Sequence, residues 1–186
     1  IVGSGGMVVI DDSNCMVNLA KFFLEFTADE SCGKCPPCRI GTKVMLDKLT
    51  DITEGRGKEE DIELLLDLSH DIINTSLCGL GQTAPNPVLT TIKYFRDEYE
   101  SHIKEQWCKA GVCRELSTFY IDEALCKGCG MCAKACPKGA ITGEKKKPYR
   151  INYELCIKCR SCYEACPPKT GAVKIGAKNM FIESKK

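Results

Sequence analysis

Apolar residues recur every three or four positions through the first half of the chain, which is the spacing of one helix face. Ser13 or Asn14 fits as the N-cap of the first segment, and Pro36-Pro37 suits the first turn of the second. Asn86-Pro87 is a cap followed by a proline at the first helical position. The predicted helices cover residues 14–27, 36–54, 58–73 and 86–103, with a loop over residues 79–84. Four helices with short connections predict an up-down-up-down bundle over residues 13–107.

Beyond Trp107 the helical period gives way to short alternating segments and an internal repeat of about 30 residues. Residues 121–141 align with residues 151–173 once two extra residues after Cys166 are allowed for. Short strands are expected over residues 118–122, 140–142, 149–153 and 172–175. The sequence therefore predicts a duplicated α+β domain over residues 108–186, so the fold class is α plus α+β.

Eight of the fifteen cysteines form two copies of one run, C-x2-C-x2-C-x3-C-P. This run is the bacterial ferredoxin pattern, in which three cysteines hold one 4Fe-4S cluster and the fourth ligates the other cluster. One predicted ligand set is Cys126, Cys129, Cys132 and Cys166, and the other is Cys156, Cys159, Cys162 and Cys136. Two zinc knuckles or a disulfide framework are the alternatives, but neither explains why both copies share the same spacing.

A third triplet lies between the first two predicted helices, at Cys32, Cys35 and Cys38, and no cysteine follows it at short range. The fourth ligand must come from elsewhere, and Cys78 is the candidate, because the loops after the first and third helices lie at the same end of the bundle. The sequence therefore predicts one 4Fe-4S cluster in the bundle. A structural zinc held by four cysteines is the alternative.

Three cysteines remain, Cys15, Cys108 and Cys113, and His102 precedes the last two. The start of the first helix and the end of the fourth meet at one end of an up-down-up-down bundle, so these four side chains can converge. Three thiolates and one imidazole are suitable zinc ligands, and the sequence predicts a zinc site here. The alternatives are unrelated buried thiols with a surface histidine, or a disulfide between Cys108 and Cys113. His70 has no cysteine partner beside it and is left out of the site.

Composition narrows the classes of function. The net charge is +1, but acidic side chains dominate residues 13–107 and basic ones dominate residues 108–186. Basic side chains offset the negative charge of cluster–thiolate units and steer acidic partners. No nucleic-acid partner is expected, because no basic–aromatic pattern or groove-binding motif accompanies the charge. No apolar run reaches the length of a membrane span, and cluster-spaced cysteines favour a reducing, cytoplasmic environment.

The segments ESCGKCPPCRIG and SLCGLGQTAPNP resemble the 4Fe-4S bundle of the NADH-oxidising flavoprotein subunit of complex I and its soluble relatives. Followed directly by a two-cluster ferredoxin module, they resemble the C-terminal part of the beta subunit of electron-bifurcating or NAD(P)-linked FeFe-hydrogenases. The resemblance implies that residues 1–12, with a strand at Met7–Ile10, end an upstream β-grasp-like domain. It also implies that FMN and NAD(P)H bind upstream of Ile1, since no glycine-rich flavin or dinucleotide motif occurs here.

The resemblance implies an electron-transfer relay through three 4Fe-4S clusters, linking an upstream FMN and NAD(P)H site to ferredoxin and a hydrogenase catalytic subunit. A thioredoxin-like 2Fe-2S subunit is a further expected partner in a hetero-oligomer. The fragment itself is expected to contain no catalytic residue. Two alternatives remain open: a relay subunit of an NAD-linked formate dehydrogenase, and a docking arm in which the clusters are mainly structural.

Overall fold

The computed structural model describes residues 8–177, which divide into a unit ending at Leu116 and a unit beginning at Ser117. The division falls after the predicted one at Trp107, because Cys108, Cys113 and Leu116 are buried in the core of the first unit.

The domain end expected at residues 1–12 falls largely outside this range. The residues from Ile1 to Met7 lie outside the described residues, so the start of the strand expected at Met7–Ile10 does too. Residues 8–10 carry no strand, so the expected strand is absent from the part that the structure describes. A strand needs a neighbour to accept its backbone hydrogen bonds, and no described strand pairs with these residues.

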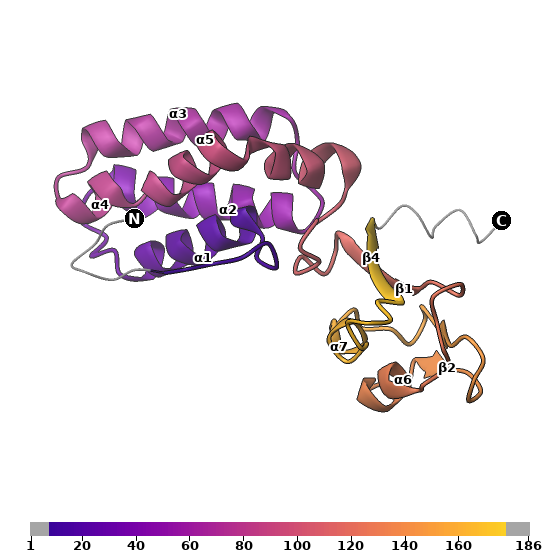
Figure 1. The fold of residues 1–186 in the computed structure, drawn as a ribbon. Coiled ribbons are helices and arrows are strands. Elements are labelled where there is room, and N and C mark those ends of the chain that lie inside the picture. The colour runs from indigo at the N-terminus through magenta and orange to yellow at the C-terminus, as the bar shows by residue number, and fades with distance from the viewer. Residues whose placement is uncertain (1–7, 178–186) are drawn as a thin grey trace. The chain divides into compact units, whose positions relative to one another are not determined.

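The first unit is helical. Figure 1 shows α1 and α2 in one layer and α3 and α5 in the other. Its helices are α1 Met16–Asp29, α2 Thr42–Thr53, α3 Glu60–Thr75, α4 Gly79–Thr83 and α5 Asn86–Glu100. Two π-helical turns, η1 Pro37–Gly41 and η2 Ser101–Glu105, adjoin α2 and α5. Helices α1, α3 and α5 agree with the predicted segments to within three residues at their ends, whereas α2 begins six residues after the predicted start at residue 36, because η1 occupies residues 37–41.

One apolar core joins these helices. The side chains of Leu24, Leu49, Leu65 and Val88, one from each longer helix, are fully buried. Burying an aliphatic side chain of this size stabilises the fold by about 1.5–3 kcal/mol relative to leaving it in water. Tyr99 is also buried, and its hydroxyl lies 2.8 Å from the Thr91 hydroxyl, so its polar end is satisfied within the core.

The loop predicted over residues 79–84 is wrong, because Gly79–Thr83 forms the short helix α4. The Gln82 amide donates to the Cys78 carbonyl and the Ala84 amide to the Leu80 carbonyl, so the turn closes despite its two glycines. The N-cap of α5 is Pro85 rather than the predicted Asn86. The periodicity also gave no sign of the kink at Phe95, where φ is −137° and ψ is 39°.

The second unit is built from two short antiparallel sheets and two single-turn helices. Its elements are β1 Ser117–Ile121, α6 Met131–Ala135, β2 Ile141–Thr142, β3 Arg150–Ile151, α7 Ser161–Glu164 and β4 Val173–Ala177. The outer strands β1 and β4 pair with Phe119 opposite Ile175, and the inner strands β2 and β3 pair with Ile141 opposite Ile151. Each repeat therefore contributes one strand to each sheet, which interlocks the two halves.

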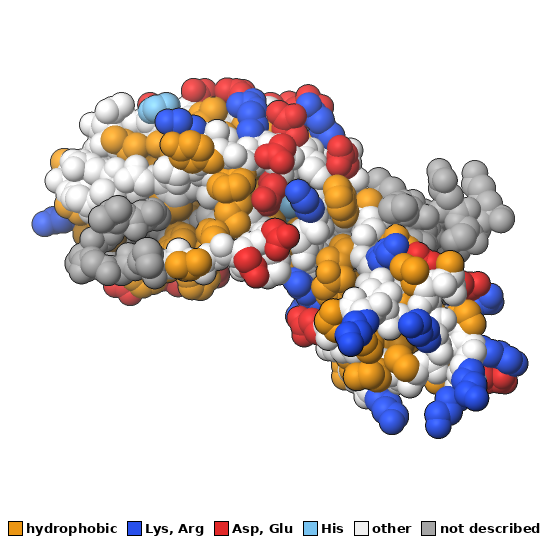
Figure 2. All heavy atoms as spheres, in the orientation of Figure 1, with side chains coloured by type: hydrophobic (Ala, Val, Ile, Leu, Met, Phe, Trp, Pro, Cys, Tyr) orange, Lys and Arg blue, Asp and Glu red, His pale blue; other side chains and the backbone are white. Residues whose placement is uncertain are grey.

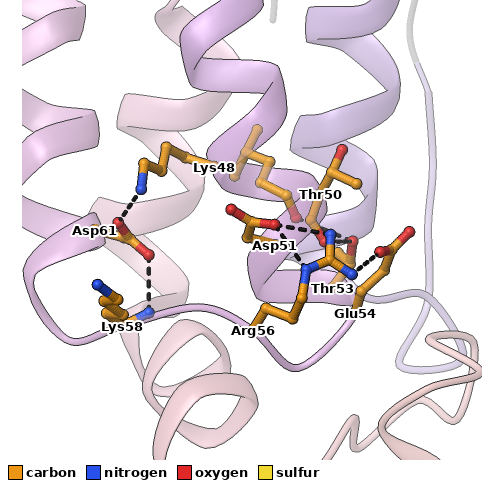
Figure 3. Close-up of polar contacts among 9 residues, drawn as sticks. Lys48, Thr50, Asp51, Thr53, Glu54, Arg56, Lys58 and Asp61 are labelled. Carbon is orange, nitrogen blue, oxygen red and sulfur yellow. Dashed lines mark hydrogen bonds and ion pairs between the residues drawn. The ribbon is translucent and has the colours of Figure 1, made fainter.

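A buried carboxylate fixes the start of α3 against α2 (Figure 3). Asp61 is 2% exposed, accepts the backbone N–H of Lys58 at 2.8 Å, and lies 2.9 Å from the Lys48 ammonium. Nearby, the exposed Arg56 guanidinium contacts Asp51 and Glu54. The Asp61 carboxylate is removed from water, whereas the Asp51 carboxylate that contacts Arg56 is not. The two aspartates therefore allow a buried and an exposed ion pair to be compared in one domain.

We predict that Asp61→Ala destabilises the first unit by about 2 kcal/mol, because it deletes a charge-assisted hydrogen bond and leaves Lys48 without its buried partner. Asp51→Ala, at the exposed contact, should cost less than about 1 kcal/mol. Anaerobic denaturant unfolding followed by helical circular dichroism measures both. Equal losses for the two variants would contradict the role assigned to Asp61.

Candidate iron–sulfur and metal centres

The second unit brings cysteines from both repeats around one cavity. The cavity has a volume of about 310 Å³, part of it open to solvent, and is lined by Cys126, Cys129 and Cys132 together with Cys166 from the other repeat. Three of these side chains come from the loop before α6 and its first turn, and Cys166 follows α7. The structure therefore places the four cysteines of the first predicted set at a common space.

The second cavity mirrors the first. It has a volume of about 320 Å³, part of it open to solvent, and is lined by Cys156, Cys159 and Cys162 with Cys136 from the first repeat. Phe119, Ile141 and Ile151 supply apolar wall, so little water reaches the sulfur atoms from that side. Each cavity receives its fourth cysteine from the other repeat because each sheet pairs one strand of the first repeat with one strand of the second.

The electrostatics of these cavities favour a cationic occupant. Burial raises the pKa of Cys162 to about 12, and the nearby Cys156 and Cys159 thiolates act in the same direction. Burial, with Cys126 and Cys129, also raises the pKa of Cys132. Several thiolates can share such a space only if positive charge is placed among them, and the iron of a 4Fe-4S cluster provides it. The donor sets therefore fit the clusters that the spacing predicts.

In the first unit, the cysteine triplet lies between α1 and α2. Cys35 and Cys38 are buried while Cys32 is exposed, and the η1 turn begins directly after Pro36. A hydrogen bond from the Leu77 backbone N–H lowers the pKa of Cys35, which places the segment leading to Cys78 against the triplet. The exposed Cys78 then lies at the start of α4.

Gly81 shows how closely α4 approaches the triplet. A Cβ atom at Gly81 would lie 2.5 Å from the Ser76 hydroxyl oxygen and 3.2 Å from the Cys38 Cβ. The Ser76 hydroxyl is buried and has no hydrogen-bond partner among the described residues. A cluster sulfur at this place would be a suitable acceptor for the Ser76 hydroxyl. The unpaired hydroxyl therefore supports a 4Fe-4S group here independently of the contact between Leu77 and Cys35.

Two hydroxyls near the sulfur atoms were missed by the sequence reasoning. The Ser31 hydroxyl oxygen accepts the Gly33 N–H at 3.3 Å and lies 3.3 Å from the Cys38 sulfur, and a ligating Cys38 thiolate, which has no proton to give, would accept from that hydroxyl. The Ser161 hydroxyl lies 3.3 Å from the Cys159 sulfur. Hydrogen bonds to cluster sulfurs raise reduction potentials. Serine one or two residues from a ligand cysteine was the available signal.

Four further ligand-type side chains meet inside the first unit. The ligand atoms of Cys15, His102, Cys108 and Cys113 all lie within 4.8 Å of one another, and all four residues are buried. The Cys15 sulfur is 3.3 Å from the His102 Nε2 and 3.8 Å from the Cys113 sulfur. Cys15 is also the N-cap of α1, with its sulfur accepting the Asn18 N–H at 3.5 Å. The structure thus assembles the four residues predicted for zinc.

The imidazole of this group is oriented by its other nitrogen. His102 Nδ1 lies 2.7 Å from the Glu98 carbonyl oxygen, and donation to that oxygen leaves Nε2 facing the sulfur atoms. Burial by itself lowers the pKa of His102, but hydrogen bonds with Cys108 and Cys15 outweigh it and raise the value to about 10. The neighbouring sulfurs raise the pKa of Cys113 and lower that of Cys108, as expected when three buried thiols share protons.

Charged side chains are distributed unevenly between the units. Figure 2 shows lysine and arginine side chains over the second unit and mixed signs over the first. Lys145, Lys146 and Lys147 are exposed in the turn between the two repeats, and Lys147 contacts Glu144 at 2.7 Å. None of the described helices is both long and apolar enough for a membrane span.

Comparisons with known proteins agree with this division. Residues 18–102 match the NADH-ubiquinone oxidoreductase-F iron-sulfur binding region, and residues 118–167 match a 4Fe-4S dicluster domain. The chain is similar to NADP-reducing hydrogenase subunit HndC of Solidesulfovibrio fructosivorans, with 54% identity over 80% of this chain and 30% of that protein. It is also similar to the F subunit of the NADH-quinone oxidoreductase of Mycobacterium tuberculosis, with 44% identity over 58% of this chain and 24% of that protein.

Among solved structures, an NAD+-reducing [NiFe]-hydrogenase in the H2-reduced state matches 52% of this chain and 16% of its own with 34% identity and a TM-score of 0.50. The resemblance to NAD(P)-linked hydrogenase subunits and to the F subunit of NADH-quinone oxidoreductase is confirmed, while the chain spans less than a third of these relatives' length. The chain thus combines a segment that matches the NADH-ubiquinone oxidoreductase-F iron-sulfur binding region with a following segment that matches a 4Fe-4S dicluster domain.

Proposed function

We propose that this chain is an electron relay with three 4Fe-4S clusters. The observation that carries the proposal is the pair of cavities in the second unit, each lined by three cysteines of one repeat and the fourth of the other. The third cluster is assigned to Cys32, Cys35, Cys38 and Cys78, on the contact of the Leu77 N–H with Cys35 and the approach of Gly81 to Cys38.

The clusters supply reversible one-electron chemistry, and the chain determines where and how readily it happens. Its cysteines ligate, and the hydroxyls of Ser31 and Ser161 donate toward sulfur. Phe119, Ile141 and Ile151 keep water from one cavity. Ligation, hydrogen bonds to sulfur and burial are the means by which proteins set cluster potentials, so these residues tune the relay.

The proposed setting is a flavin-dependent, NAD(P)-linked hydrogenase complex in a reducing cytoplasm. FMN and the nicotinamide site are assigned upstream of Ile1, to a part of the relatives that this chain does not span. The proposed partners are a hydrogenase catalytic subunit, a thioredoxin-like 2Fe-2S subunit and ferredoxin. Support comes from the hydrogenase relatives and from the basic surface of the second unit, which suits an acidic carrier.

We also propose that Cys15, His102, Cys108 and Cys113 bind one zinc ion. The support is the convergence of four buried ligand atoms within 4.8 Å and the orientation of His102 by the Glu98 carbonyl. Zinc ligation removes the thiol protons that otherwise have to be shared among three buried sulfurs. Because zinc is not redox active, its role here is to tie the start of α1 to the segment after α5.

The first prediction is a content of about twelve irons per reconstituted chain, from three clusters of four. Cys78→Ser should lower it to about eight, because the bundle cluster loses its fourth ligand while both ferredoxin sets stay complete. Iron and sulfide assays with quantitative electron paramagnetic resonance (EPR) measure this. About eight irons in the unmodified chain would remove the bundle cluster, and clusters that do not cycle at physiological potentials would favour a docking role.

The second prediction separates close packing from cluster ligation in α4. Gly81→Ala should reduce the bundle-cluster signal at least severalfold, because the added methyl overlaps Ser76 and presses on Cys38. Gly79→Ala is the matched control, since a methyl there meets no atom within 4 Å and should leave the cluster intact. Cluster absorbance and EPR intensity measure both variants. An intact cluster in Gly81→Ala would contradict the placement of α4 beside the triplet.

The third prediction is one zinc per chain. His102→Ala should release it, while His70→Ala, at the exposed histidine of α3, should retain it. Metal analysis with anomalous scattering at the zinc edge measures the content and the place. Zinc that persists after Cys108 and Cys113 are both changed to serine would show that these residues do not hold it.

A further inference from the structure

The two cluster loops of the second unit have the same backbone but different side chains. In the first loop Gly128 and Gly130 adopt φ of +66° and +75°. In the second loop the corresponding residues are Lys158 and Arg160, with φ of +54° and +68°. The repeat therefore keeps two left-handed turns and replaces both glycines by cationic residues.

Packing explains the glycines of the first loop. A Cβ atom at Gly128 would lie 2.5 Å from the backbone nitrogen and oxygen of Lys147, and one at Gly130 would lie 2.9 Å from the Tyr149 hydroxyl. Packing does not explain the residues of the second loop, because a left-handed backbone is unfavourable for any side chain with a Cβ, and glycine or asparagine is the usual solution. Strain of this kind is retained where it serves the site.

One of the two cationic side chains lies at the second cavity. Arg160 lines the space that Cys136, Cys156, Cys159 and Cys162 share, and its side chain is only 21% exposed. Lys158 is half-buried in the same loop. In the first cavity the corresponding lining residue is Gly130, which carries no charge.

A hydroxyl adds to the difference. Ser161 lies 3.3 Å from the sulfur of Cys159, and a ligating thiolate has no proton to give, so the hydroxyl is the donor. The first loop has Met131 at the corresponding position, which has no donor and is 48% exposed. All three differences thus place positive charge or a hydrogen-bond donor at the second site.

We infer that the two clusters of the second unit differ in reduction potential, the one held by Cys136, Cys156, Cys159 and Cys162 being the higher. Reduction adds one negative charge to a cluster, and Arg160 and Ser161 stabilise that charge at one site only, while Lys158 adds positive charge to the same loop. The inference rests on the proposed function, because it takes the crossed ligand sets as given. An electron in the singly reduced domain then resides mainly at this cluster.

Some differences act in the opposite direction. Lys127 lines the first cavity where Ile157 lines the second, and Cys129 is exposed whereas Cys159 is half-buried. Lys127 is itself exposed, so solvent and salt screen its charge. Glu164 lies 3.5 Å from Arg160 but is 68% exposed. The half-buried donors act through a medium of lower dielectric constant, so their effect is the larger.

The test is an anaerobic EPR-monitored redox titration of the full chain. Ser161→Ala and, separately, Arg160→Asn should lower the higher of the two ferredoxin-type midpoint potentials and leave the other in place. Asparagine tolerates left-handed backbone, so the second variant removes the charge without adding strain. We expect each change to shift the electron distribution between the clusters by up to about tenfold, which is about 59 mV for a one-electron couple.

Met131→Ala is the matched control, because it alters the same position of the other loop without removing a donor, and both potentials should stay unchanged. Met131→Ser should raise the lower potential. The bundle cluster is recognised by the signal that Cys78→Ser removes. Iron content in each variant tests the ligand sets separately from the order of the potentials. Loss of iron would count against the ligand sets of the proposed function. Full iron with no shift, or with a fall of the lower potential, would overturn the ordering.

Discussion

Ligation of metal by thiolates is the constraint on which the second unit depends. Its sheets have only two strands each, β2 and β3 are two residues long, and its core joins Phe119, Ile141 and Val173 to two ligand cysteines. Such a core buries too little apolar surface to offset the loss of chain entropy. In the proposed assignment, crossed ligation supplies what the core lacks, since each cluster would join one repeat to the other. Binding of the clusters and folding of this unit are therefore one equilibrium.

The first unit offsets the loss of chain entropy on folding with its apolar core. Its four longer helices bury a continuous apolar core, so the helices can pack before any metal is bound. The cysteine centres are set at the two ends of α1: Cys15 precedes this 14-residue helix and Cys32 follows it, which separates the centres by about 20 Å at about 1.5 Å per residue. The zinc ion proposed for the first of them would hold the chain without diverting electrons from the cluster proposed for the second.

The grouping of the eight cysteines of the second unit around two cavities was predictable, because the spacing of the cysteines determines which of them can share one site. The ends of elements were less so, since they depend on contacts made only in the fold. Cys15 caps α1 in place of Ser13 or Asn14 because it belongs to a buried group with His102. The α4 helix, expected as a loop from its glycines, forms where Gly81 has to pass close to Cys38. The first unit extends to Leu116 because Cys108, Cys113 and Leu116 are buried in its core. The sequence did not indicate this, since these residues show no helical periodicity.

The two repeats of the second unit have the same pattern of cysteines but differ in the side chains beside them. Both repeats keep the same cysteine spacing, the same single-turn helix and the same pair of left-handed residues, as the clusters require. What differs is the set of side chains that ligation does not fix: glycines where Lys147 and Tyr149 press on the first loop, and Lys158 and Arg160 at the same places in the second. In the proposed relay, clusters that differ in affinity for the electron would hold it mainly at one site, and positions beside the ligands can supply that difference without disturbing the clusters. The strain at Lys158 and Arg160 is thus better explained by the charge that these residues bring than by the turns that they form.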